Sequence, residues 1–229
     1  MQQADEIIAW LRATGSPRNI EGMRRFGICG AELCGVPMPA LRREAKRIGR
    51  NHPLAMELWA SGLHEARILA TLLADPQQLT DGELARLTGD FDSWDVVDQA
   101  CGNLLWRVPA AVEQIDRLAD DDREYVRRTA FALIATLAVK EKRYDDACFE
   151  KFLPLIVRYA TDERNFVRKA VNWALRGIGK RNLRLRERAL ATAEALAAST
   201  HRTTRWIGRD AVRELQAEKT IEMIRRHRG

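Results

Sequence analysis

The chain has 229 residues, 46% of them hydrophobic, and its 38 lysines and arginines against 32 acidic residues give a net charge of +6. Such a chain can bury a real core and fits one large domain or two small ones, and its basic balance favours an anionic partner, nucleic acid first. The longest uncharged apolar run, residues 129–139, is shorter than the roughly 20 residues that span a bilayer, and no signal peptide is recognisable. We therefore expect a protein that neither crosses a membrane nor is exported.

Metal and disulfide chemistry are not indicated by the cysteines and histidines. The four cysteines form no CxxC pair, and the four histidines have no paired spacing with each other or with cysteine. Reduced thiols in a cytoplasmic protein are expected, with no metal and no cofactor.

Residues 1–60 are predicted to form the N-terminal helices. Alanine, leucine, arginine and glutamate dominate the chain, which favours helix, and no segment alternates apolar and polar residues as a strand would. The prolines stand where helices are expected to begin or end.

A helix is predicted to start near Phe91, with Asp92 or Ser93 as its N-cap. Trp94 and Asp98 lie one turn apart on one face of this helix. A carboxylate next to an indole is a candidate site. The alternative is that an aspartate in the first turns of a helix serves the macrodipole or a salt bridge.

An internal repeat organises the second half of the chain. The sequence DDREYVRR at 121–128 resembles DERNFVRK at 162–169, and a degenerate copy follows at 204–209. An offset near 40 residues is typical of the paired helices of HEAT and armadillo repeats, which stack to share a core. The predicted fold is all-α, a curved superhelical solenoid of HEAT-like repeats. Residues 1–229 are expected to form a single domain in which residues 61–229 are the stacked repeats that form a concave DNA-binding face.

Two repeat helices are predicted to carry both an apolar stripe and cations. In the helix over residues 165–180 the buried stripe is expected at Val167, Val171, Ala174, Leu175 and Ile178. Lys169, Trp173, Arg176 and Lys180 share another side, a pattern that suits a sugar–phosphate backbone. The alternative is that Trp173 belongs to the core and the cations form a solvated face.

The preceding repeat helix, residues 123–139, has its apolar stripe at Val126, Ala130, Leu133 and Leu137. Arg128 lies off that stripe and corresponds to Lys169 in the next repeat. Arg127 and Arg128 are candidates for DNA contacts, and the alternative is that they only pair with Asp121, Asp122 or Glu124.

These stretches together resemble the AlkD-type DNA alkylation repair glycosylases, a family of HEAT-like repeat proteins. The resemblance rests on RRFGICGAELCGVPMPALRREAK near the N-terminus, FDSWDVVDQ, REYVRRTAFAL and NFVRKAVNWALRGIGKRN, and it covers residues 24–215. Ser93 stands where the family's pattern often has a second tryptophan before the Trp-x-x-x-Asp. By position, the resemblance implies a catalytic set of Asp98, Trp94, Trp173 and Arg128.

The resemblance implies excision of cationic alkylated purines, N3-alkyladenine and N7-alkylguanine, from double-stranded DNA, on the backbone side of the lesion and without a tight base pocket. Asp98 would stabilise the positive charge that develops on the deoxyribose. We expect DNA contacts from Arg127, Lys169, Arg176, Lys180 and Arg181, a monomer, and a cytoplasmic location, at the bacterial nucleoid when DNA is bound. The alternatives are a HEAT-repeat protein that binds bent, damaged or branched DNA without catalysis, and a protein-binding scaffold.

Overall fold

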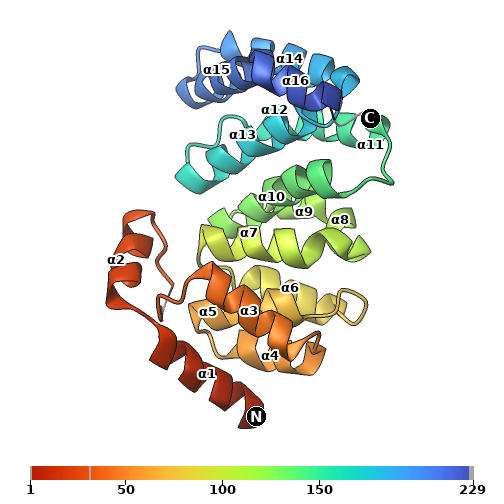
Figure 1. Ribbon diagram of the computed structural model, residues 1–229. Helices are drawn as coiled ribbons and strands as arrows, with labels where there is room; N and C mark the ends of the chain where they lie inside the picture. The colour runs from red at the N-terminus through yellow and green to blue at the C-terminus, as the bar shows by residue number, and fades with distance from the viewer. Residues whose placement is uncertain (1, 31, 227–229) are drawn as a thin grey trace. The chain divides into compact units, whose positions relative to one another are not determined.

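The computed structural model describes residues 2–30 and 32–226, and these residues form α-helices with one short 3-10 helix, η1 (Figure 1). Within this part of the chain no β-strand occurs, and the extended backbone makes only an isolated bridge between Glu32 and Leu63. The helices are α1 (Gln2–Thr14), α2 (Pro17–Arg25), α3 (Met38–Ile48), α4 (His52–Ala60), α5 (His64–Leu73), α6 (Asp81–Gly89), α7 (Trp94–Asn103), η1 (Leu105–Arg107), α8 (Pro109–Glu113), α9 (Ile115–Asp120), α10 (Glu124–Lys140), α11 (Asp146–Glu150), α12 (Phe152–Tyr159), α13 (Asn165–Gly179), α14 (Leu183–Ala197), α15 (Arg202–Gln216) and α16 (Glu218–Arg226).

The helices divide between two compact units, residues 1–112 and residues 113–229. The predicted all-α class is confirmed, whereas the expectation of a single domain stays a prediction. Each unit has its own apolar interior, as a pair of amphipathic helices requires when neither can cover its apolar face alone.

In the first unit, α5 packs against α3, α4 and α7. Polar contacts of α4 and α5 recur at one sequence offset, because Trp59 of α4 donates to Asp90 (2.9 Å) and the His64 ring of α5 bonds Asp95 (2.9 Å), each 31 residues further on. The indole of Trp59 is almost fully buried and meets Phe91 edge-on, with ring centroids 5.8 Å apart. The bond from His64 to Asp95 holds the N-terminal end of α7 beside α5.

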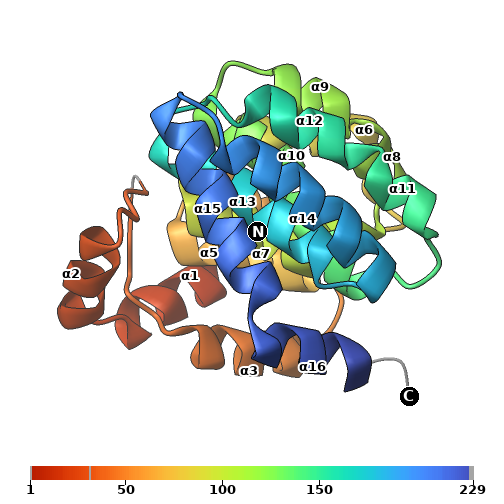
Figure 2. The same ribbon diagram turned by 90° about the horizontal axis from the view of Figure 1, so that it is seen from above.

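In the second unit, α10 and α13 pack along their length. Both helices lie within one residue of their predicted bounds, and every residue of the two predicted apolar stripes is buried. The helices approach closely at Gly177, where an added Cβ would lie 3.4 Å from the Cα of Ala135. Figures 1 and 2 show α14 and α15 side by side, and Gly208 permits this contact because a Cβ there would lie 2.2 Å from the backbone nitrogen of Ala197.

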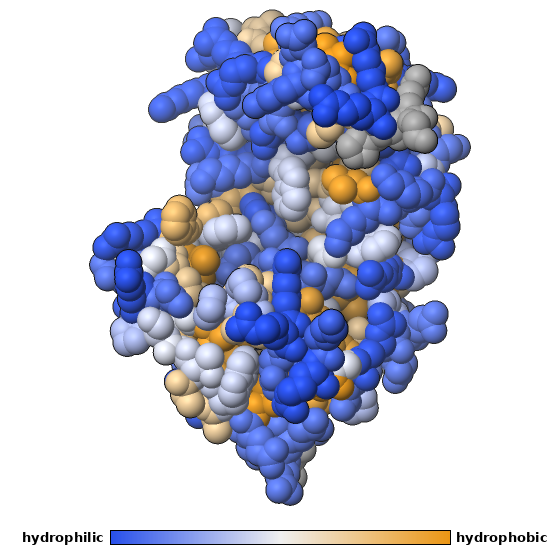
Figure 3. Space-filling model, viewed as in Figure 1, coloured by the Kyte–Doolittle hydropathy of each residue, from blue (hydrophilic) through white to orange (hydrophobic). Residues whose placement is uncertain are grey.

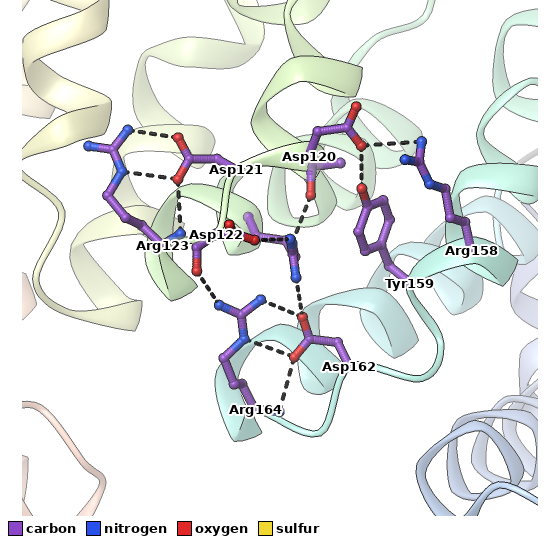
Figure 4. A network of polar contacts seen from close by, with 10 residues as sticks. Asp120, Asp121, Asp122, Arg123, Arg158, Tyr159, Asp162 and Arg164 are labelled. Carbon is purple, nitrogen blue, oxygen red and sulfur yellow. Dashed lines mark hydrogen bonds and ion pairs between the residues drawn. The ribbon is translucent and has the colours of Figure 1, made fainter.

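The repeated sequence corresponds to a repeated turn before α10 and before α13 (Figure 4). The Asp121 carboxylate accepts from the backbone and side chain of Arg123, and the Asp162 carboxylate accepts in the same way from Arg164. The two turns are also joined, because Arg127 donates to Asp162 (2.8 Å) and Arg164 donates to the carbonyl of Asp122 (2.6 Å). The Asp-x-Arg turn therefore both orders the chain before a helix and connects consecutive repeats.

Asp162 is central to this connection. Its side chain is only 6% exposed. Burial alone would raise its pKa, but hydrogen bonds from Arg164 and Arg127 outweigh burial and lower the pKa below its usual value. The carboxylate is therefore ionised in the folded protein at neutral pH.

We expect Asp162→Asn to lower the free energy of unfolding at pH 7 by about 2 kcal/mol, the usual range for hydrogen bonds to a charged group. Since the folded pKa is depressed, the contribution of Asp162 is complete above its unfolded pKa of about 3.9 and is lost as the pH falls further. The difference between wild type and variant in the free energy of unfolding, measured with urea, should therefore become smaller below about pH 4. Asp116→Asn, an exposed aspartate of α9, is the control, and an equal loss in both variants would contradict the role of Asp162.

Candidate functional site

A pocket of about 570 Å³ lies in the first unit, and we call it the Trp94 pocket. Helices α2, α5 and α7 and the segment between α2 and α3 contribute its walls. Its lining consists of Arg18, Asn19, Gly22, Met23, Ile28, Gly35, Val36, Pro37, Met38, His64, Glu65, Ile68, Trp94, Asp95, Asp98 and Gln99. Two residues of the predicted catalytic set, Trp94 and Asp98, thus line one pocket from consecutive turns of α7.

The segment at residues 34–36 is held by a buried carboxylate. Glu65 of α5 is 1% exposed and accepts hydrogen bonds from the backbone N–H groups of Cys34 (2.9 Å), Gly35 (2.5 Å) and Val36 (3.3 Å). Three donors offset the cost of burying the charge. Gly35 has a φ of +79°, which glycine adopts without strain, and so lets three successive amides converge on one side chain.

Cys34 is held as a thiol at this position. Burial, together with the nearby charges of Glu65 and Glu32, raises its pKa to about 11. A thiol with such a pKa is a poor nucleophile at neutral pH.

A second polar group, the His64–Asp95 pair, fixes the start of α7. Nε2 of His64 lies 2.9 Å from the Asp95 carboxylate, which also accepts from the Ser93 hydroxyl at 2.5 Å. Burial raises the pKa of Asp95, but the hydrogen bonds from His64 and Ser93 lower it more, and its net pKa is below the usual value. Ser93 occupies the N-cap position, as predicted, but its hydroxyl bonds Asp95 instead of capping the helix.

Nδ1 of His64 is buried and, among the described residues, has no hydrogen-bond partner. The histidine is 1% exposed and lines the Trp94 pocket. A buried polar atom without a partner is costly, and a ligand that supplies one relieves that cost.

Trp94 is oriented by the segment that follows α2. Its Nε1 donates to the carbonyl of Phe26 at 3.1 Å, and the indole is half-buried. Asp98, one turn further along α7, is also half-buried. The indole and the carboxylate are therefore both accessible to a ligand in the pocket.

The predicted residues of the second unit lie on α10 and α13 and in the turn that follows α13. Arg128 is buried and donates to the carbonyl of Phe166 (2.6 Å), so it differs from the exposed Lys169 to which it corresponds in the repeat. Arg127 donates to Asp162 and to the Ala119 carbonyl (2.8 Å). Both arginines thus have structural contacts, and Arg127 has the Asp122 contact that was the alternative reading for it.

Three of the other predicted cations also have partners within the second unit. Arg176 pairs with Glu214, Lys180 lies 2.6 Å from the same carboxylate, and Arg181 donates to the carbonyls of Ala138 and Tyr144. Trp173 is half-buried, so its exposure lies between that of a core residue and that of a residue on the exposed cationic side. Lys169 alone of this group is exposed and has no ion pair within the described residues.

Sequence reasoning did not select a second cationic group, on α15. Arg202, Trp206 and Arg209 lie on one face of that helix beside a depression of about 330 Å³, and all three are exposed. The Arg168 guanidinium of α13 lies over the Trp206 ring, 5.1 Å from its centroid. The degenerate third repeat copy, at 204–209, covers part of this face and was the available signal.

The described residues contain neither a metal-binding cluster nor a membrane-spanning helix. Over residues 2–30 and 32–226 no group of three or more histidine, cysteine or acidic side chains is placed to hold a metal ion. Within the same ranges no helix combines the length and apolar character needed to cross a bilayer.

Comparison with known proteins identifies the family. A family profile for the DNA alkylation repair enzyme matches residues 7–215. The chain belongs to the DNA alkylation repair enzyme family. No curated protein matches the sequence.

One solved structure shows that this member of the family has a HEAT-like repeat fold. A similar structure belongs to "a new family of proteins related to the HEAT-like repeat DNA glycosylases with affinity for branched DNA structures". It has 18% identity, covers 91% of this chain and 94% of its own, and superposes with a TM-score of 0.76. A designed armadillo repeat protein in complex with a (KR)4 peptide is 15% identical over 83% of this chain and 86% of its own, with a TM-score of 0.37.

We expect Glu65→Gln to loosen residues 34–36, because an amide accepts through one oxygen and brings its own N–H groups toward the backbone donors. Hydrogen–deuterium exchange should show reduced protection of the amides of residues 34–36, with a loss of about 2 kcal/mol in unfolding free energy. Glu6→Gln, an exposed glutamate of α1, is the control. Unchanged protection at 34–36 in the Glu65 variant would exclude the carboxylate as the group that holds this segment.

Proposed function

We propose that this protein is a DNA glycosylase that excises N3-alkyladenine and N7-alkylguanine from duplex DNA. The observation that carries the proposal is the meeting of Trp94 and Asp98 in one pocket, which supports the catalytic pair implied by the resemblance. Membership of the DNA alkylation repair enzyme family supports the same reaction class. We expect the protein to act as a monomer on double-stranded DNA.

The reaction asks little of the protein because the substrate base already carries a positive charge. The bond between C1′ of the deoxyribose and the purine nitrogen breaks, and its electron pair neutralises the purine. Water then adds to C1′ with release of a proton, which leaves an abasic site and the free base. What remains to be stabilised is the positive charge that builds on the sugar, and an ionised carboxylate beside C1′ does so.

Asp98 is proposed to be that carboxylate and to orient the water. At about 4 Å and an effective dielectric constant near 20, the attraction between Asp98 and the sugar cation approaches ~4 kcal/mol before the cost of desolvation is subtracted. That is enough to accelerate loss of a cationic base and too little for an ordinary one. The indole of Trp94 is proposed to contact the sugar and add cation–π stabilisation. The roles proposed for Arg128 and Trp173 rest on the family resemblance.

We expect Asp98→Asn to lower the single-turnover rate of 7-methylguanine release from methylated duplex DNA by at least about tenfold, because the amide keeps the shape but not the charge. Affinity for undamaged duplex should stay equal or rise, since a negative charge has been removed. Asp81→Asn, an exposed aspartate of α6, is the matched control. An unchanged release rate in the Asp98 variant would remove Asp98 from the mechanism.

For the DNA contacts of the second unit we propose Lys169 together with Arg202 and Arg209, next to the exposed Trp206. Among the described residues these three exposed cations have no ion pair, so binding to phosphate breaks no ion pair of the fold. Arg127, Arg176, Lys180 and Arg181 remain proposed DNA contacts, but each would have to share or exchange its present partner.

We expect Lys169→Ala, Arg202→Ala and Arg209→Ala each to reduce the slope of log K against log salt by about one, as loss of one phosphate contact does. Fluorescence anisotropy with a labelled duplex at several salt concentrations measures this slope. Lys142→Ala, an exposed lysine that follows α10, serves as the control. Slopes equal to wild type in all three variants would place the DNA contacts elsewhere.

The second candidate function is binding of branched DNA without excision, favoured by the described affinity of the structurally similar family. Two assays on the same pure protein separate the candidates. Release of free alkylpurine from methylated duplex supports the glycosylase. No release, combined with preference for a four-way junction over a duplex of equal length, supports the binding protein.

A further inference from the structure

Trp206 of α15 is an exposed ring at the end of a series of packed aromatic rings. In the sequence repeat it corresponds to Tyr125 and Phe166. Those two rings are half-buried and pack against each other, with centroids 5.8 Å apart. Trp206 is 37% exposed, and within the described part of the second unit no aromatic ring packs against it. The third copy of the repeat therefore presents an open aromatic surface where the first two copies use theirs for packing.

The Trp206 indole is held from one side by α13. The guanidinium of Arg168 lies over the ring, 5.1 Å from its centroid, and is itself oriented by a hydrogen bond to the Asn165 side chain (3.2 Å). One turn further along both helices, the Asn172 amide donates to Asp210 (2.7 Å), which fixes α15 against α13. A ligand therefore meets the remaining surface of an ordered ring, and little conformational freedom is lost when it binds.

Arginines surround this ring, and hydrophilic side chains dominate the surface over α15 and α16 in Figure 3. A depression of about 330 Å³ beside the ring is lined by Arg202, Arg205, Trp206, Arg209, Asp210 and Arg213. Arg205 donates to two backbone carbonyls, and Arg213 pairs with the one carboxylate of this lining. Arg202 and Arg209 are exposed, have no ion pair over residues 2–30 and 32–226, and lie one helical turn to either side of Trp206.

An aromatic ring between two cations without ion pairs suits a chain that carries both negative charges and flat rings. Single-stranded nucleic acid is such a chain, because its phosphates follow one another along the backbone and every unpaired base has an open face. In a duplex the faces of the bases are covered by the neighbouring base pairs, so the same helix contacts only the sugar–phosphate backbone. An acidic peptide offers charge without regularly spaced rings. The arrangement therefore favours unpaired nucleotides over both of these partners.

We propose that α15 binds single-stranded DNA, with one base stacked on Trp206 and the adjacent phosphates bound by Arg202 and Arg209. This inference rests on the DNA contacts proposed for the second unit and adds the kind of DNA that completes them. It involves undamaged bases and leaves the roles proposed for Trp94 and Asp98 unchanged. DNA in which a duplex adjoins an unpaired segment is thus a better ligand for the second unit than a continuous duplex.

The first experiment measures the contribution of the bases by fluorescence anisotropy with the intact protein. The probe is a labelled oligothymidine of about 20 nucleotides, and its control is an oligonucleotide of equal length and charge in which the internal nucleotides are abasic. We expect wild type to bind oligothymidine at least about fivefold more tightly than the abasic chain, Trp206→Ala to lose this preference and Trp206→Phe to keep most of it. Arg209→Ala should weaken binding of both chains equally. Equal affinity of wild type for the two chains, or a preference that persists in Trp206→Ala, overturns the proposal.

The second experiment separates failure of this inference from failure of the proposed function. Trp206→Ala should leave the affinity for a blunt duplex and the release of 7-methylguanine from methylated duplex at wild-type values, whereas its affinity for a duplex with a thymidine overhang should fall at least about fivefold. An equal loss for the blunt duplex and the overhang overturns stacking on an unpaired base and leaves the glycosylase standing. No release by wild type, with a preference for oligothymidine that Trp206→Ala abolishes, overturns the glycosylase and leaves α15 as a site for single-stranded DNA.

Discussion

The buried carboxylate of Glu65 is the constraint on which the candidate site depends. A carboxyl group with almost no exposure is tolerated only where hydrogen-bond donors surround it, and here the donors are three successive backbone amides. Those amides can converge only if the chain turns at Gly35 with a positive φ, so one side chain of α5 dictates the path of residues 34–36. The wall of the Trp94 pocket follows from that path, although neither Glu65 nor Gly35 was a candidate for chemistry.

In the second unit some basic side chains hold the repeats together, and others are exposed to solvent. The arginines of the Asp-x-Arg turns donate to the carboxylate of their own turn. Arg127 and Arg128 donate to a carboxylate and a carbonyl of the next repeat. Cations that lie outside this network, such as Lys169 and Arg202, remain exposed. A high content of arginine in such a repeat is therefore partly a property of the fold, and only the exposed fraction bears on a polyanionic partner.

The sequence predicted the structure best where a structural motif is also repeated in the amino-acid sequence. DDREYVRR and DERNFVRK share both the Asp-x-Arg turn and the start of the apolar stripe, so the bounds of α10 and α13 followed from the pattern. The first unit also has a regular offset, 31 residues from Trp59 to Asp90 and from His64 to Asp95, but the paired residues differ in type, so the sequence does not resemble itself. The wall of the Trp94 pocket could not be predicted for a related reason. Its path is fixed by hydrogen bonds between Glu65 and residues 29 to 31 positions away in the sequence. Arg128 and Lys169 occupy corresponding positions of the repeat, yet one cation is buried and the other is exposed. The repeat pattern therefore does not predict the burial of a single side chain.

Under the proposed function, a carboxylate site within a basic protein resolves a conflict in the recognition of alkylated DNA. Phosphates attract cations, and a cation next to the lesion would repel the charged base and oppose the charge that develops on the sugar. In water at physiological salt, exposed charges are screened over about 8 Å, whereas charges in a partly enclosed pocket are screened much less. In the proposed function, exposed cations such as Arg202 attract DNA while the half-buried Asp98 acts at short range on one nucleotide. Under the proposed function, burial of the acidic groups is thus what lets opposite charges serve the same substrate.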